Sequence, residues 1–115
     1  MERKKYEQLM GKDGNEENIL DYEFNKIAGN VLKEKRTSKN ISLDSLSNKI
    51  NNLVSKQAIS RYENGQARIK NNVFLKICYA LNCEPADIFS EIHKKYIEHI
   101  DNNMQDIMKR IKDNE

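Results

Sequence analysis

The sequence predicts an all-α fold of five helices, of which the last is long and amphipathic. Apolar residues recur at spacings of three and four along most of the chain, which is the period of a helix with one buried face. No segment alternates apolar and polar residues with period two, so we expect no β-sheet. Asn, Ser and Gly residues separate the periodic segments and supply the caps and turns that short helices need.

Length and charge indicate how the chain is organised. Its 115 residues suffice for one domain with an appendage. The formal net charge is only +2, but the charges are unevenly placed: residues 1–21 hold 4 basic and 6 acidic side chains, residues 22–92 hold 11 and 7, and residues 93–115 hold 5 and 5. We therefore expect a polar N-terminal arm (1–21), a basic helical domain (22–92) and a C-terminal helix used for oligomerisation (93–115).

The N-terminal arm, residues 1–21, is expected to be flexible or only partly helical. Residues 11–15 contain two glycines, an Asp and an Asn, which are loop formers. The triplet Arg3-Lys4-Lys5 could enter a minor groove of DNA, or it could belong to a solvated tail.

The first two helices follow from apolar spacing and capping residues. The first begins at Tyr22, and residues 37–40 interrupt it. Ser42 is a suitable N-cap for the second helix, and Asn51 and Asn52 tolerate the left-handed conformation of the turn that follows it. The apolar faces consist of Phe24, Ile27, Ala28, Val31 and Leu32 in the first helix and of Leu43, Leu46 and Ile50 in the second.

The third helix, residues 55–64, has the clearest local signals. Ser55 is a suitable N-cap, and Gly65 supplies the left-handed residue that ends the helix. One face carries the apolar residues Ala58, Ile59 and Tyr62, and the other carries Lys56, Gln57, Ser60, Arg61 and Asn64. A helix of about three turns with such a polar face suits the major groove of DNA.

Two more helices complete the pattern. A polar connector, residues 66–72, leads to a fourth helix that ends with Asn82 as its left-handed residue. The fifth helix begins at residues 84–88, with Pro85 near the first position, where its missing amide is harmless. The apolar face of the fourth helix consists of Val73, Phe74, Ile77, Cys78 and Leu81.

The fifth helix continues to the end of the sequence, because no proline or glycine follows Pro85. Its apolar stripe is too long for a domain whose core is already filled, so we expect the stripe to mediate dimerisation. The spacing departs from strict heptads, which makes a two-stranded coiled coil only one option. The stripe consists of Phe89, Ile92, Tyr96, Ile100, Met104, Ile107 and Ile111.

The cysteines and histidines do not indicate an active site or a metal site. Cys78 and Cys83 lie in an apolar helical context, where a reduced thiol behaves as a small hydrophobe. His93 and His99 are six residues apart, on different helix faces, and neither pair has the spacing of a structural zinc site. With no glycine-rich phosphate loop and no clustered carboxylates, we expect no enzymatic activity, no cofactor and no metal.

Several residues between positions 27 and 90 form a recognisable pattern, namely Gly29, Leu32, Arg36, Ile41-Ser42, Leu46-Ser47, residues 59–65 (Ile-Ser-Arg-Tyr-Glu-Asn-Gly), Leu75-Lys76-Ile77 and Ala80-Leu81. Taken in order, these residues resemble the lambda-repressor-like (Cro/CI, XRE-type) helix-turn-helix DNA-binding family. The sequence departs from the family pattern in three ways. From Leu46 to Glu63 it has two more residues than usual, so the turn between the second and third helices is enlarged and lacks its usual glycine. Leu43 replaces a frequent glutamine that contacts phosphate, and Ile69 replaces a proline.

The resemblance implies that helix 55–64 enters the major groove and that an arginine–glutamate pair, Arg36 and Glu63, joins the first helix to it. The guanidinium and ammonium donors suit guanine, and the glutamine amide suits adenine. Each of these side chains could instead be an ordinary solvated group. The expected base contacts are Lys56, Gln57, Ser60 and Arg61, and the expected phosphate contacts are Ser42, Ser55, Asn64, Arg68 and Lys70.

The first functional hypothesis is a homodimeric, sequence-specific repressor that binds double-stranded DNA. The filled set of base-reading positions favours it over two alternatives, an antagonist that titrates a related repressor and an antitoxin that binds a toxin through residues 93–115. No apolar run approaches the ~20 residues of a membrane span, and no signal core follows Met1. We therefore expect a cytoplasmic protein of a bacterium or phage, located at the nucleoid when bound to DNA.

Overall fold

The computed structural model describes the backbone of residues 14–113, and within it the side chains of residues 23–106 and 108–113. This part of the chain folds into five helices and contains no strand, which confirms the all-α prediction. The helices are α2 (Gly14–Ser38), α3 (Leu43–Lys49), α4 (Lys56–Glu63), α5 (Asn71–Ala80) and α6 (Pro85–Asp113).

Helix α2 begins eight residues before the predicted start at Tyr22. Residues 14–21, which the sequence assigned to a polar arm, are its first two turns. Residues 15–21 contain neither proline nor glycine, so nothing in the local sequence interrupts the helix there. The triplet Arg3-Lys4-Lys5 lies outside the described residues.

The turns between the helices confirm the capping residues that the sequence predicts. The Ser42 hydroxyl accepts a hydrogen bond from the Ser45 amide at 3.0 Å, and the Ser55 hydroxyl accepts one from the Ala58 amide at 3.1 Å. The left-handed conformation occurs at the predicted positions and also at Asn40, where only a helix break was expected. The positive φ values are 57° at Asn40, 56° at Asn51, Asn52 and Asn82, and 72° at Gly65.

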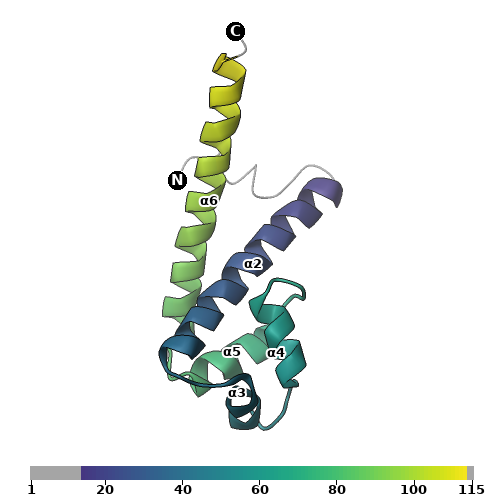
Figure 1. The fold of residues 1–115 in the computed structure, drawn as a ribbon, viewed down its shortest axis with the longest axis vertical. Helices are drawn as coiled ribbons and strands as arrows, with labels where there is room; N and C mark the ends of the chain where they lie inside the picture. The colour runs from purple at the N-terminus through teal and green to yellow at the C-terminus, as the bar shows by residue number, and fades with distance from the viewer. Residues whose placement is uncertain (1–13, 114–115) are drawn as a thin grey trace.

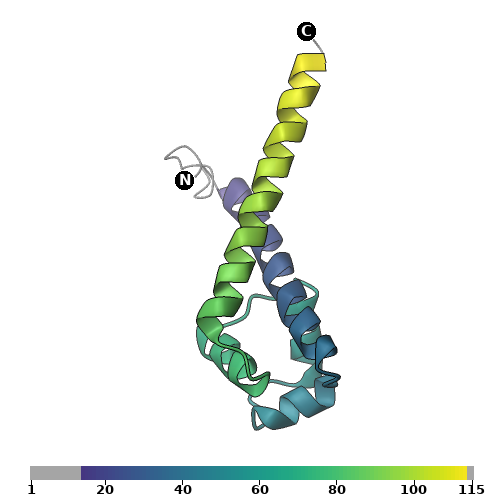
Figure 2. The same ribbon diagram turned by 90° about the vertical axis from the view of Figure 1, so that its left-hand side faces the viewer.

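The helices form a compact group from which two long helices project (Figure 1). Helices α3, α4 and α5 gather at one end of a molecule that measures 56 × 27 × 24 Å. Helices α2 and α6 rise from this group and cross, and α6 extends well beyond the N-terminal end of α2 in both views (Figures 1 and 2). Every helix contributes to one core, whose most deeply buried side chains are Val31, Leu46, Ile59, Ile77, Cys78, Leu81 and Ile92.

Helices α2 and α6 pack against each other in antiparallel directions. The rings of Phe24 and Tyr96 meet edge to face, with their centroids 5.3 Å apart. Ion pairs flank this contact at the borders of the two helices, namely Lys35–Glu91 at 3.1 Å, Lys95–Glu34 at 3.4 Å and His99–Glu23 at 3.0 Å. The proximal half of α6 is therefore part of the domain.

This packing corrects the predicted dimerisation stripe. Ile92 and Tyr96 are only 1% and 8% exposed, because α2 covers them within the same chain. The sequence reasoning assumed that the core was complete before α6 began, whereas the apolar face of α2 needs α6 to cover it. Phe89 and Ile111 remain exposed, Ile100 and Met104 are half-buried, and the side chain of Ile107 lies outside the description.

Within the described residues, no helix is both long enough and apolar enough to cross a membrane.

Candidate nucleic-acid interface

Helix α4 presents one polar face to solvent. Its opposite face is held in the core by Ile59, which is 1% exposed. The four predicted base contacts occupy adjacent turns on the outer side of the helix, where positions three and four residues apart are neighbours. Lys56, Gln57 and Arg61 are exposed, and Ser60 is half-buried.

A buried ion pair fixes α4 to the first helix of the domain. The Arg36 guanidinium donates two hydrogen bonds to the Glu63 carboxylate, from Nε to Oε2 at 2.7 Å and from Nη2 to Oε1 at 3.0 Å. The two side chains are only 11% and 4% exposed. The remaining nitrogen, Nη1, donates to the carbonyl of Ile41 at 2.7 Å, just before α3 begins. One arginine thus joins α2, the start of α3 and the end of α4, with the planar geometry that suits Arg and carboxylate.

Two glycines allow the backbone of α2 to approach α4. A Cβ atom on Gly29 would lie 2.0 Å from the carbonyl oxygen of Tyr62 and 2.8 Å from that of Glu63. A Cβ atom on Gly65 would lie 2.7 Å from the Cα of Lys26, and the φ of Gly65 is positive. Both contacts are backbone contacts, so a side chain at either position would have to displace a helix.

The enlarged turn between α3 and α4 is organised by Ser47, a role that the sequence reasoning missed. Ser47 is 5% exposed, and its hydroxyl donates to the carbonyl of Val54 at 2.8 Å while lying 3.2 Å from Oδ1 of Asn52. The backbone amide of Asn52 in turn donates to the carbonyl of Ser47 at 2.8 Å. These bonds satisfy buried polar groups and fix where α4 begins relative to α3. In the sequence, the signal for this role was a serine on the otherwise apolar face of the second helix.

A second unpredicted contact joins the first turns of α3 and α4. The Lys56 ammonium lies 3.3 Å from a carboxylate oxygen of Asp44. Both side chains are exposed, so the pair adds little stability. It nevertheless brings Asp44 beside a predicted base contact, and no sequence pattern indicated this cross-helix pairing.

The predicted phosphate contacts fall into three groups. The hydroxyls of Ser42 and Ser55 accept capping hydrogen bonds, which leaves the proton of each hydroxyl available to a phosphate. Lys70 is exposed at the N-cap position of α5, and Asn64 is exposed but donates to the carbonyl of Ser60 at 2.9 Å. Arg68 is exposed too, but it lines a pocket beside α2 and α6.

Both cysteines are free thiols. Cys78 is fully buried in the core, and this burial raises the pKa of its thiol from 9.0 to about 11. Cys83 is half-buried, and its sulfur lies 3.5 Å from the carbonyl oxygen of Leu81. Cys78 therefore occupies its position as a small apolar group.

Comparison with known proteins agrees with this geometry. Residues 32–88 match the helix-turn-helix family model. Two solved structures with the same fold are crystal structures of the clp gene regulator ClgR from Corynebacterium glutamicum. One is 24% identical, covering 63% of this chain and 91% of that chain with a TM-score of 0.57. The other is 20% identical, covering 76% and 89% with a TM-score of 0.62. No curated protein sequence matches the chain.

The fold and the family match together define a DNA-binding regulator of the helix-turn-helix class. The match spans residues 32–88, from the last two turns of α2 to the first turn of α6, and in these residues the chain resembles the lambda-repressor-like, XRE-type branch of that class.

Proposed function

We propose that the protein is a sequence-specific transcriptional repressor that binds DNA as a homodimer and inserts α4 into the major groove. The observation that carries this proposal is the exposed face of α4, which holds three long donor side chains on a helix whose other face is fixed by buried contacts. Base contacts require such rigidity, because a side chain reads a base edge only when its helix has a defined position. Lys56, Gln57, Ser60 and Arg61 would contact base edges.

The surroundings of α4 support backbone contacts to the same DNA. The Lys56–Asp44 contact indicates that the first turns of α3 and α4 lie close together, so Ser42 and Ser55 would contact phosphates near one another. Lys70 would contact a phosphate beyond the other end of α4. Asp44 is the exception, because its exposed carboxylate would repel phosphate unless Lys56 stays beside it.

Repression and dimerisation are the finer parts of the proposal. A domain that fills a groove excludes other proteins from the same site, which supports repression. The distal part of α6 extends beyond α2 and carries Met108 and Ile111, which are 66% and 60% exposed. A second copy could cover these side chains, and a two-fold dimer would then bind half-sites roughly 34–36 Å apart, about one turn of DNA.

The test is selection of bound sequences from random DNA, followed by affinity measurements on Arg61→Ala and Lys70→Ala. Arg61→Ala should weaken binding to the selected site by roughly 1–3 kcal/mol and relax the preference at one base pair. Lys70→Ala should weaken all sequences nearly equally and lower the salt slope by about one unit. If Arg61→Ala binds the selected site and random DNA in the wild-type ratio, α4 is not the reading helix.

An interaction protein, either an antagonist of a related repressor or an antitoxin, is the second candidate. The exposed distal end of α6 favours it, because a different protein could cover the same side chains. The antagonist predicts that selection from random DNA enriches no sequence, so an enriched motif that depends on Arg61 would exclude it. The antitoxin could bind DNA as well, and a toxin gene beside its own gene would distinguish it from the repressor.

A further inference from the structure

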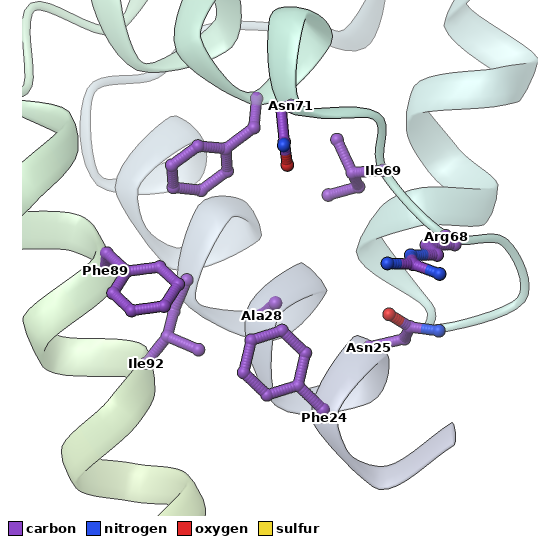
Figure 3. A pocket seen from close by; sticks show the side chains of 9 residues that line it. Phe24, Asn25, Ala28, Arg68, Ile69, Asn71, Phe89 and Ile92 are labelled. Atoms are coloured by element: carbon purple, nitrogen blue, oxygen red, sulfur yellow. The ribbon is translucent and has the colours of Figure 1, made fainter. Parts of the chain in front are cut away.

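A pocket of about 310 Å³ lies between α2, the α4–α5 connector, α5 and α6 (Figure 3). Its apolar wall is built by Phe24 and Ala28 of α2, Phe74 of α5, and Phe89 and Ile92 of α6. Phe89 is 54% exposed, so about half of this apolar side chain faces water. The volume is at the lower end of the range for small-molecule sites, which are also mostly apolar and open between elements of one domain.

The opposite edge of the pocket is polar and positively charged. Among the described residues that line the pocket, Arg68 is the only charged one. Asn25 lies beside it, whereas Asn71 lies farther away, beyond Ile69 (Figure 3). Figure 3 shows the Arg68 guanidinium extending from the connector toward the Asn25 amide, on the far side of the cavity from Phe89. No ion pair of Arg68 occurs among the described side chains, in contrast to Arg36, whose guanidinium is fully engaged by Glu63 and Ile41.

We propose that this pocket binds a small molecule with a flat apolar body and one carboxylate. The body would lie against the phenylalanine rings, whose exposed faces would then be removed from water. The carboxylate would accept two hydrogen bonds from the Arg68 guanidinium, the geometry that arginine provides for planar anions. The amide group of Asn25 would supply a further donor at the same edge. The charge of Arg68 selects an anion over a neutral or cationic ligand.

Occupation of the pocket would alter DNA binding, a step that rests on the proposed function. Arg68 and Lys70 lie two residues apart in the connector between α4 and α5. A ligand that holds Arg68 against α2 restrains the segment from which Lys70 would contact phosphate. By thermodynamic linkage, DNA and ligand must change each other's affinity by the same factor.

The binding test uses naphthalene-2-carboxylate as the probe and naphthalene-2-carboxamide, a neutral molecule of the same shape, as its control. Calorimetry on the full chain should show that the carboxylate binds at least about tenfold more tightly, since a charge-assisted pair contributes more than a neutral hydrogen bond. Amide NMR shifts should concentrate at Phe24, Asn25 and Phe74. Equal affinity for the two probes, or shifts elsewhere on the domain, would overturn the proposal.

Variants of Arg68 test the role of its charge. Arg68→Gln should remove the preference for the carboxylate, and Arg68→Glu should reverse it in favour of naphthalen-2-ylmethylammonium. Arg68 is exposed, so both variants should keep the wild-type melting temperature. The matched control is Lys76→Gln, which removes an exposed positive charge from the other side of α5 and should bind the carboxylate as the wild type does. Loss of binding in this control would mean that net charge, not the pocket, attracts the probe.

The DNA test measures affinity for the selected site with and without saturating naphthalene-2-carboxylate. The probe should change the affinity of the wild type for this DNA by at least about threefold. The affinity of Arg68→Gln should be the same with and without the probe. An unchanged wild-type affinity would overturn the regulatory step. If the chain binds no DNA under any condition, the proposed function fails while the calorimetric result on the pocket stands by itself.

Discussion

Glu63 is an acidic residue whose charge is satisfied entirely inside the domain. Its carboxylate accepts both hydrogen bonds from Arg36 and is shielded from solvent at the end of α4. A pair of this kind contributes little net stability compared with an apolar contact, but removing one partner leaves the other charge buried and uncompensated. The pair therefore acts mainly by fixing the position of α4.

We predict that Glu63→Gln lowers the free energy of unfolding by about 1–3 kcal/mol, because Arg36 keeps its charge and loses its counterion. Thermal unfolding followed by circular dichroism would measure the loss. Glu98→Gln is the matched control, since Glu98 is exposed on α6 and should leave the melting temperature unchanged. A wild-type melting temperature for Glu63→Gln would contradict the buried geometry described above.

The two thiols should react at different rates. Because burial raises the pKa of Cys78 to about 11, only about one thiol in a thousand is ionised there at pH 8, and the thiolate is the reactive form. We predict that iodoacetamide labels the half-buried Cys83 first and labels Cys78 only as the domain opens. Mass spectrometry of partly labelled protein would show this order. Equal labelling rates in the folded protein would show that the core around Cys78 is open.

At the scale of the helices, local signals predicted what local chemistry controls. Helix α4 has a side-chain cap at Ser55 and a left-handed stop at Gly65, and both functions depend on neighbouring residues alone. The predicted start of α2 at Tyr22 was wrong, because no local signal distinguishes the polar end of a helix from a polar arm. The Lys56–Asp44 contact could not be predicted either, because it depends on how two helices approach across a turn of unusual length.

The approach of α2 to α4 leads to a prediction with an unusual sign. In a helix interior, Gly→Ala ordinarily stabilises by up to about 1 kcal/mol. We predict instead that Gly29→Ala destabilises the domain by about 1–3 kcal/mol, because its Cβ would lie 2.0 Å from the carbonyl oxygen of Tyr62 and would force the helices apart. Chemical denaturation would measure the change.

The neighbouring Asn30→Ala provides the control for this helix. Asn30 is exposed on α2, so the substitution should be neutral or stabilising through helix propensity alone. Gly29→Ala should also weaken binding to the selected DNA, since α4 can no longer keep its position. Stabilisation of both variants would mean that α2 and α4 are not in backbone contact.

At the scale of the whole molecule, α6 has two parts with different surroundings. The proximal part is packed on α2 through Ile92 and Tyr96, whereas the distal part extends past α2 into solvent (Figure 2). Sequence periodicity predicted one continuous stripe because it cannot distinguish apolar positions covered within the chain from those left for a partner. Removal of the whole segment 93–115 would therefore damage the core as well as any dimer.

We predict that the double variant Met108→Glu/Ile111→Glu is a folded monomer, whereas the wild type is a dimer at tens of micromolar. The two side chains are exposed in the single chain, so the substitutions leave its core intact but place four charges within any two-fold contact between distal helices. Sedimentation would give the oligomeric state. Affinity for a full operator should fall by on the order of 10²-fold, because binding of the second half-site becomes intermolecular.

The control Lys109→Glu/Lys112→Glu also introduces two carboxylates three residues apart, on an adjacent face of α6 and with a larger change of net charge, and should remain dimeric. Both variants should keep the helical content and the melting behaviour of the domain, since none of the four side chains is buried. A wild type that sediments as a monomer would exclude dimerisation through α6 and would favour a different protein as the partner of its distal end. A dimer that survives Met108→Glu/Ile111→Glu would locate the contact elsewhere on the domain.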